Sequence, residues 1–350
     1  MPVLQNLLSR IGIPDLAPGL EAQRALDRLT KPPGSLGRLE ELTRRLAEIS
    51  GRFPPTVDRP VIFTLAADHG VVAEGVSAYP QIVTAQMVEN FLRGGAAVNV
   101  LARHAGAAVV VADMGVAGPL PAHPALVSSP IGRGTRNMCD GAAMTREEAL
   151  RAIEAGADLV LAEGGLDLIG TGEMGIGNTT AASAVVAALT GLPPATVTGT
   201  GTGIDAEGRA RKVDAITRAL AVNRPDPADG VDVLAKVGGF EIAGLCGVIL
   251  AGAASRIPVV LDGFIAGAAA LAAVRLKPDV QAYLLASHRS TEPGAAHVLE
   301  ALGLEPFLDL DMRLGEGTGS ALCISLARAA VKILGEMATF KSAGVSERSP

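Results

Sequence analysis

Two glutamates stand in segments built almost wholly of glycine and small residues. Glu173 lies within Gly-Thr-Gly-Glu-Met-Gly-Ile-Gly-Asn-Thr-Thr at 170–180, and Glu316 within Leu-Gly-Glu-Gly-Thr-Gly-Ser at 314–320. Because glycine raises the entropy cost of ordering a loop, such density is typical of backbone that takes a positive φ or lies against a ligand. A carboxylate held there is a candidate active-site acid or base. The alternative, an exposed acid in a surface turn, fits one such loop better than two.

Segment 170–180 also offers an anion site. It opens with a formal GxGxxG, and Asn-Thr-Thr at 178–180 supplies side-chain donors where a helix over 181–189 is expected, an arrangement that suits a phosphate. A dinucleotide fold would place a ribose-binding acid about 20 residues later. No Asp or Glu occurs between Glu173 and Asp205, which argues against an NAD-dependent oxidoreductase. A purely structural strand-to-helix turn stays open as an alternative.

A second candidate anion site is Gly-Thr-Gly-Thr-Gly at 199–203, with Arg211 or Lys212 on the next helix to supply positive charge. Ser290, which ends Ser-His-Arg-Ser at 287–290, either contacts phosphate or belongs to the cap of a helix that begins near residue 293. The chain contains no Gly-Lys-Ser, Gly-Lys-Thr, HExxH, CxxC or Gly-x-Ser-x-Gly motif. Ordinary P-loop, zinc-peptidase and serine-hydrolase chemistries therefore have no support.

Polar residues also follow the first predicted strand. A metal at Asp68 and His69 is disfavoured, because neighbours in extended chain point to opposite sides and no other histidine has ligand spacing to them. Polar contact with a substrate, or a capped loop, is the better interpretation. Tyr79, Pro80 and Gln86 come next, in a segment that either lines a flat apolar pocket or forms an ordinary loop.

Composition limits the partners of this chain. With 350 residues, 49% of them hydrophobic, it can bury a large core, while a net charge of −6 argues against a nucleic-acid partner. The longest apolar run, 242–255, falls short of the about 20 residues that cross a bilayer, and the N-terminus does not resemble a signal peptide. Three widely spaced cysteines predict unpaired thiols in a reducing cytoplasm. A small-molecule substrate is the remaining partner class.

The elements that must position these residues follow an α/β pattern. Short apolar runs alternate with glycine-rich turns and alanine-rich helices, which predicts a parallel sheet covered on both faces. The predicted strands are Val61–Ala66, Ala107–Ala112, Leu159–Ala162, Val259–Leu261 and Ala282–Leu285. Ligands of such sheets bind beyond the carboxyl ends of the strands. We expect the turns at 68–70, 262–263 and 287–290, and both glutamate segments, at that edge.

Both ends of the chain are predicted to be helical. Lys-Pro-Pro-Gly at 31–34 interrupts one helix, and Ser35 is a candidate cap for the next, which ends before Pro54. A last helix over 321–337 is expected to return to the N-terminal helices, followed by a polar, frayed tail over 341–350. The predicted division is therefore a helical segment at 1–55, a large α/β catalytic domain at 56–320 and a returning helix with its tail at 321–350.

Six motifs together resemble the nicotinate-nucleotide:dimethylbenzimidazole phosphoribosyltransferase family. They are KPPGSLGRLE at 31–40, DHGVVAEGVSAYP at 68–80, GEMGIGNTT at 172–180, DGF at 262–264, SHRS at 287–290 and RLGEGTGS at 313–320. The resemblance spans nearly the whole chain. It implies a cytoplasmic homodimer with a Rossmann-like doubly wound sheet and a smaller helical domain. It also implies transfer of phosphoribosyl from nicotinate mononucleotide to 5,6-dimethylbenzimidazole, giving α-ribazole 5′-phosphate and nicotinate in cobalamin synthesis, without a metal or cofactor.

The resemblance also assigns roles to residues of this chain. It makes Glu316 the general base and places Asp68, Tyr79, Pro80 and Gln86 in the segment that lines the base pocket. The region that it matches to the ribose phosphate comprises Gly175, Gly177, Asn178, Thr179, Gly201, Gly203 and Lys212. One departure is Asp205-Ala206, where relatives often carry two adjacent acids. Glu173 is expected to contact the ribose or to stabilise positive charge in the transition state, and a non-catalytic nucleotide-binding protein is the alternative function.

Overall fold

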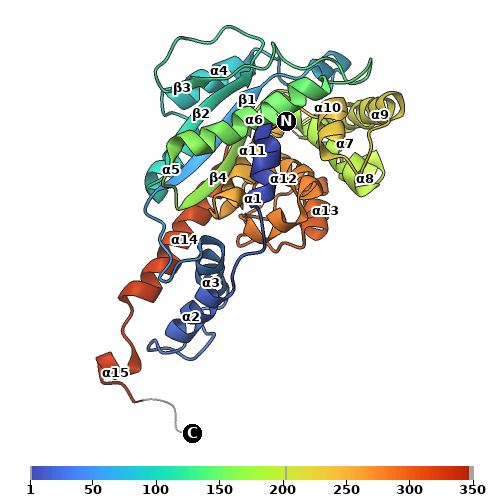
Figure 1. The fold of residues 1–350 in the computed structure, drawn as a ribbon. Coiled ribbons are helices and arrows are strands. Elements are labelled where there is room, and N and C mark those ends of the chain that lie inside the picture. Colours follow the sequence, from blue (N-terminus) through green and yellow to red (C-terminus); the bar gives the residue numbers. More distant parts are fainter. Residues whose placement is uncertain (1, 202, 347–350) are drawn as a thin grey trace.

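A six-stranded parallel sheet organises the computed structural model, which describes residues 2–201 and 203–346. The strand order is β3-β2-β1-β4-β5-β6, the doubly wound order in which the direction of winding reverses between β1 and β4. The strands are β1 (Pro60–Ala67), β2 (Ala108–Gly115), β3 (Leu126–Ser128), β4 (Leu168–Met174), β5 (Val259–Leu261) and β6 (Leu284–Ala286). The predicted Rossmann-like parallel sheet is confirmed (Figure 1).

Helices surround this sheet on both faces (Figure 1). They are α1 (Pro2–Arg10), α2 (Ala17–Leu26), α3 (Arg38–Ser50), α4 (Val83–Leu92), α5 (Ala97–Ala105), α6 (Arg146–Glu163), α7 (Asn178–Thr190), α8 (Pro194–Val197), α9 (Ala206–Asn223), α10 (Gly230–Val237), α11 (Phe240–Ala254), α12 (Phe264–Leu276), α13 (Pro293–Leu302), α14 (Thr318–Glu336) and α15 (Phe340–Ala343). Two 3₁₀ helices are η1 (Gly70–Glu74) and η2 (Pro278–Tyr283).

The alternating side chains of β1 show which elements pack on each face of the sheet. All eight residues of β1 are buried, as expected for a central strand covered on both sides. Leu65 lies against Gly244 of α11, whereas Ile62 lies against Gly317 at the start of α14. Because side chains alternate along a strand, Thr64 shares the α14 face with Ile62. One face of the sheet therefore forms the core with α11, and the other holds the segment that carries Glu316.

One predicted strand is wrong. Leu159–Ala162 forms the last turns of α6, and the strand in this region is β4, so Glu173 lies at a strand end and not in a loop. Thr145 and Glu148 form a capping box that starts α6, and its buried residues recur at helical spacing. A short apolar run does not distinguish a strand from a buried helix turn. The short strand β3 was not predicted.

The start of α3 also differs from the prediction. The residue that precedes this helix is Gly37, with φ 53° and no side-chain cap, and Ser35 lies before it. Glu40, in the first turn of α3, instead binds the segment before the helix, because its carboxylate accepts from the N–H of Leu36 at 2.9 Å and from Lys31 Nζ at 2.7 Å. Lys31 and Glu40 are both buried, so the motif at 31–40 is closed by an internal ion pair.

The C-terminal helix returns to the N-terminal segment, as predicted. α14 contacts α2 and α3 and also packs against α5 and β4, whereas α1 lies against α6 and α11. Within the described residues, α14 is the helix that is long and apolar enough to cross a bilayer, although one face of it is buried in the protein. The predicted frayed tail contains the short helix α15, and residues 347–350 lie outside the described part. The three-part domain division itself stays a prediction.

All three cysteines, Cys139, Cys246 and Cys323, are buried and unpaired. The prediction of unpaired thiols is therefore confirmed. Burial raises the pKa of the Cys139 thiol to about 11, which keeps it protonated at neutral pH.

Candidate active site

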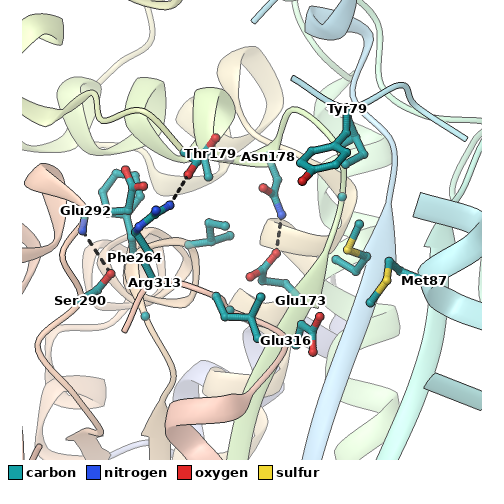
Figure 2. A pocket seen from close by; sticks show the side chains of 18 of the residues that line it. Tyr79, Met87, Glu173, Asn178, Thr179, Phe264, Ser290, Glu292, Arg313 and Glu316 are labelled. Atoms are coloured by element: carbon teal, nitrogen blue, oxygen red, sulfur yellow. Dashed lines mark hydrogen bonds between the residues drawn. The ribbon is translucent and has the colours of Figure 1, made fainter. Parts of the chain in front are cut away.

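A cavity of about 680 Å³ lies beyond the carboxyl ends of β1 and β4, next to the point where the winding reverses. It is lined by Tyr79, Val83, Met87, Glu173, Met174, Gly175, Ile176, Asn178, Thr179, Gly201, Gly263, Phe264, Ile265, His288, Ser290, Glu292, Arg313, Leu314, Gly315 and Glu316. Figure 2 shows the two glutamates between Tyr79 and Met87 on one side and Ser290 and Arg313 on the other. Both glutamate segments therefore reach one site, at the sheet edge where we expected them.

Glu316 is held in an unusual backbone conformation. Its φ is 65°, and its neighbours Gly315 and Gly317 have φ values of 84° and 104°. A non-glycine residue in the left-handed region costs free energy and persists where the surroundings enforce it. Thr64 Oγ1 donates to the Glu316 carbonyl oxygen at 3.0 Å. That oxygen would lie 2.3 Å from a Cβ at Gly172, so only glycine on β4 allows this approach.

Asp262 fixes the segment that carries Glu316 through hydrogen bonds from its backbone N–H groups. Its carboxylate accepts from the N–H groups of Gly317 at 3.0 Å, Gly319 at 2.6 Å and Ser320 at 3.3 Å. These groups belong to the first turn of α14, where N–H groups have no partner within the helix. A buried carboxylate thus caps α14 across the sheet edge and sets the position of Glu316.

The environment of Glu316 suits a general base. Its side chain is 7% exposed, and burial, followed by the nearby charge of Asp262, raises the pKa of its carboxyl above the usual value. The backbone N–H of Val98, at the start of α5, acts in the opposite direction and lowers that pKa. A carboxylate whose pKa is moved toward neutrality accepts a proton more readily than an exposed one does.

Glu173 has a different environment at the end of β4. Asn178 Nδ2 donates to its carboxyl group, which also lies against Gly315 of the Glu316 segment. Burial raises the pKa of Glu173 to about 8, and the charges of Asp262 and Glu241 add to this effect. Glu173 is therefore mainly protonated at neutral pH.

Two cations lie at the opposite end of the cavity: Arg313 lines it, whereas Lys212 is buried behind the lining residue Thr179. Lys212 is 1% exposed, and its Nζ donates to Thr179 Oγ1 at 2.6 Å. Burial lowers the pKa of Lys212 to about 8, while the charge of Glu292 acts against this shift. Arg313 Nη1 donates to the carbonyl oxygen of Gly201 at 3.1 Å. The two predicted glycine-rich anion sites, at 170–180 and 199–203, thus meet at one end of the cavity.

The structure distinguishes neighbouring side chains that the sequence left as alternative contacts for an anion. Lys212 points inward, whereas its neighbour Arg211 is exposed and pairs with Glu207 at 3.7 Å. Ser290 lines the cavity, whereas Arg289 pairs at the surface with Asp309 at 3.3 Å. Lys212 therefore bonds to Thr179, a residue that lines the cavity, although Lys212 itself is not among the lining residues.

The Tyr79 end of the cavity is apolar and more open. Tyr79 is 51% exposed at its mouth, and Val83 and Met87 line it from one face of α4. Their spacing of four residues places both side chains on the same side of the helix. Pro80 and Gln86 are exposed and do not line the cavity. The structure therefore brings Tyr79, but not these two residues, to the predicted base pocket.

The other predicted site residues have supporting positions. Asp68 is buried and does not line the cavity, and its Oδ2 accepts from the N–H of Ala117 at 2.8 Å. Gly177 precedes α7 with φ 96°, and Gly203 is exposed with φ 101°. Asp205 caps α9, because its Oδ1 accepts from the Gly208 N–H at 2.8 Å. Among the described residues, no group of three or more His, Cys, Asp or Glu is arranged to hold a metal ion.

Sequence reasoning assigned no role to several residues that line the cavity. Arg313 stands directly before the Glu316 segment, and Glu292 lies two residues after Ser290, so proximity to known motifs was an available signal for both. Val83 and Phe264 carried no such signal, because an apolar side chain near a motif is far more often part of the core.

The site agrees with what known proteins show. A model of the phosphoribosyltransferase family matches residues 11–345. The chain belongs to this family. The nicotinate-nucleotide–dimethylbenzimidazole phosphoribosyltransferase of Chloroflexus aggregans is 57% identical over 350 residues, and that of Geobacter metallireducens is 56% identical over 349, each match covering 99% of both chains.

A solved structure of a relative extends this likeness to the fold. The crystal structure of CobT from Thermus thermophilus is 52% identical to this phosphoribosyltransferase, with a TM-score of 0.90 over 94% of this chain and 99% of that one. Identity at this level over nearly the full length supports the enzyme class predicted from the motifs, and the oxidoreductase alternative is wrong.

Proposed function

We propose that this cavity transfers the 5-phosphoribosyl group of nicotinate mononucleotide to 5,6-dimethylbenzimidazole, giving α-ribazole 5′-phosphate and nicotinate. The observation that carries the proposal is the order of groups along the cavity. Glu316 lies between an apolar end, which suits a flat base, and an end with Lys212 and Arg313, which suits a phosphate. Two substrates that occupy these ends meet beside Glu316.

The chemistry requires one proton acceptor. Nicotinate leaves the ribosyl C1 as a neutral ring from a pyridinium, so its departure requires no enzyme acid. The attacking benzimidazole uses one ring nitrogen, while its other nitrogen loses a proton. Glu316 accepts that proton, aided by its raised pKa. Direct attack from the face opposite nicotinate converts the β-linkage to the α-linkage without a covalent intermediate.

Glu173 takes a supporting role in this proposal. Being protonated near neutrality, it donates a hydrogen bond to a ribose hydroxyl more readily than it stabilises a positive charge. Asn178 orients it, and the fixed positions of the two flat substrates supply much of the remaining rate enhancement.

The function is tested by incubating the purified protein with both substrates. We expect nicotinate and α-ribazole 5′-phosphate in equal amounts, with the α-configuration visible in the NMR spectrum of the ribose. Release of nicotinate in the absence of a base would indicate a hydrolase. Binding of both substrates without turnover would indicate the non-catalytic nucleotide-binding alternative.

Lys212→Met tests the phosphate end. Loss of a charge-assisted hydrogen bond should raise the KM for nicotinate mononucleotide about 10- to 100-fold, while the KM for the base stays within about 2-fold. Arg211→Met is the matched control, since this exposed neighbour points away from the cavity, and we expect wild-type constants. Equal losses for both substrates in Lys212→Met would contradict the assignment.

We also propose that the enzyme is a cytoplasmic homodimer. Ile13, Leu16 and Leu20 are 79%, 58% and 55% exposed in the N-terminal segment, an apolar surface that a second subunit would cover. Sedimentation equilibrium should give twice the mass of one chain, and a monomer at micromolar concentration would contradict the proposal.

A further inference from the structure

Thr84 is a buried residue that links two segments of the cavity wall, α4 and residues 175–177. It lies on α4, next to Val83 and three residues before Met87, which line the apolar end. The Thr84 side chain is completely buried and does not line the cavity. Its Oγ1 accepts a hydrogen bond of 3.0 Å from the backbone N–H of Ile176. One hydroxyl thus joins the helix of the base end to the loop that precedes α7.

That loop, residues 175–177, holds the phosphoribosyl end in place. It leads directly into Asn178 and Thr179, which line the cavity. Its glycines lie against neighbouring groups: a Cβ on Gly175 would be 2.3 Å from the carbonyl oxygen of Ala67, and one on Gly177 would be 2.8 Å from Val72. Glycine permits this approach but supplies no side chain to fix the loop. Besides the backbone bond from the Asn178 N–H to the Gly175 carbonyl oxygen, the loop is held by the bond from the Ile176 N–H to Thr84.

The direction of the hydrogen bond between Thr84 and Ile176 follows from the groups that form it. A backbone N–H only donates, so the Ile176 N–H is the donor and the Thr84 hydroxyl oxygen is the acceptor. Asp68 is buried and does not line the cavity, so the structure does not place it in the base pocket where the resemblance placed it. Its Oδ2 accepts from the Ala117 N–H at 2.8 Å.

We propose that Thr84 is a positioning residue for the phosphoribosyl donor: its hydroxyl fixes the 175–177 loop and with it Asn178 and Thr179. The inference rests on the proposed function, because it assigns the α7 end of the cavity to the nucleotide. Thr84 touches neither substrate. Its effect on catalysis passes through the loop.

Two variants of Thr84 separate positioning from stability. Thr84→Val keeps the shape but removes the hydroxyl, whereas Thr84→Ser keeps the hydroxyl and removes a buried methyl group. Because Val leaves the buried Ile176 N–H without an acceptor, we expect the KM for nicotinate mononucleotide to rise about 5- to 20-fold, with the KM for the base within about 2-fold. Thr84→Ser should retain nearly wild-type constants, although both variants lower the melting temperature.

Thr43→Val is the control for loss of stability alone. Thr43 is buried in α3, away from the cavity, and its Oγ1 donates to the Leu39 carbonyl oxygen. We expect wild-type constants in this variant. The proposal is overturned if Thr84→Val keeps the wild-type KM for the nucleotide, or if Thr84→Ser is as impaired as Thr84→Val. Failure of the proposed function itself would be visible separately, as absence of product with the wild-type enzyme.

Discussion

Glu173 and Glu316 have similar local sequences and are both buried with raised pKa values, but they are held in place by different contacts. Glu173 extends from the end of a central strand, bonded to Asn178, and its pKa of about 8 keeps it neutral at pH 7. Glu316 projects from a segment with three consecutive positive φ values, held by Asp262 through backbone N–H groups. The carboxyl group of Glu173 itself accepts a hydrogen bond, from Asn178. Glu316 is positioned instead through hydrogen bonds to the backbone of its own segment, from Thr64 and to Asp262.

This difference separates two uses of glycine. Around Glu316, glycine allows positive φ and the close approach of a carbonyl oxygen to β4 at Gly172. In β4 itself, glycines leave the space that the segment carrying Glu316 occupies. A strained backbone that is fixed by buried groups is a common way to hold a reacting group in one position. The comparison predicts that Glu316 carries the proton transfer and Glu173 supports it.

Glu316→Gln should have the largest effect. The amide keeps the shape but accepts no proton, so we expect kcat to fall about 10²- to 10⁴-fold while both substrates still bind. Steady-state assays of α-ribazole 5′-phosphate formation, together with calorimetry, measure the two effects. Turnover close to wild type would remove Glu316 from the role of base and would make the two glutamates equivalent again.

Asp262→Asn should have the next largest effect, acting through Glu316. An amide cannot accept from all three N–H groups of the α14 turn, so we expect kcat to fall about 10- to 100-fold. Removal of the Asp262 charge should also lower the pKa of Glu316, which moves the acidic limb of the pH–kcat/KM profile to lower pH. A fall in kcat with an unmoved limb would show that Asp262 affects only the fold.

Glu173→Gln should have the smallest effect at neutral pH. Glutamine resembles the neutral acid that Glu173 already is below pH 8, so we expect kcat/KM at pH 7 to stay within about 10-fold of wild type. Above pH 8 the wild-type protein gains negative charge at Glu173 and loses positive charge at Lys212. Both changes disfavour the anionic nucleotide.

The pH profile therefore gives Glu173→Gln a second measurement. Wild-type kcat/KM for the nucleotide should fall above pH 8 with the slope of two ionisations, and the variant should fall with the slope of one, because only Lys212 still titrates. Identical slopes in both proteins would show that Glu173 does not titrate in this range. A loss at pH 7 as large as that of Glu316→Gln would contradict its supporting role.

Much of the fold followed from local patterns. The strands around 61–66 and 259–261 were visible as apolar runs, and the placement of ligands beyond their carboxyl ends follows from parallel topology. Leu159–Ala162 failed as a strand because four apolar residues carry no period of their own. β3 has three residues, two of them exposed, and offers little pattern to detect.

Residues of the candidate site could be predicted where they belong to short polar or glycine-rich motifs. Glu316, Thr179 and Ser290 line the cavity as expected from their segments. Pro80 and Gln86 do not, since the orientation of a side chain on a loop or a helix start depends on packing against other elements. Arg313 and Glu292 gained their significance only when distant loops came together.

The sequence by itself determined the residue types, the glycine frames and the parallel α/β order, because these depend on neighbours along the chain. Only the tertiary structure decided which neighbours hold each glutamate and raise its pKa. The pKa of Glu173 depends on burial and on Asp262 and Glu241, and the position of Glu316 depends on Asp262 and Thr64, all distant in sequence. Desolvation and Coulomb interactions act through space, so the glutamates of two nearly identical motifs have their pKa values shifted by different neighbours.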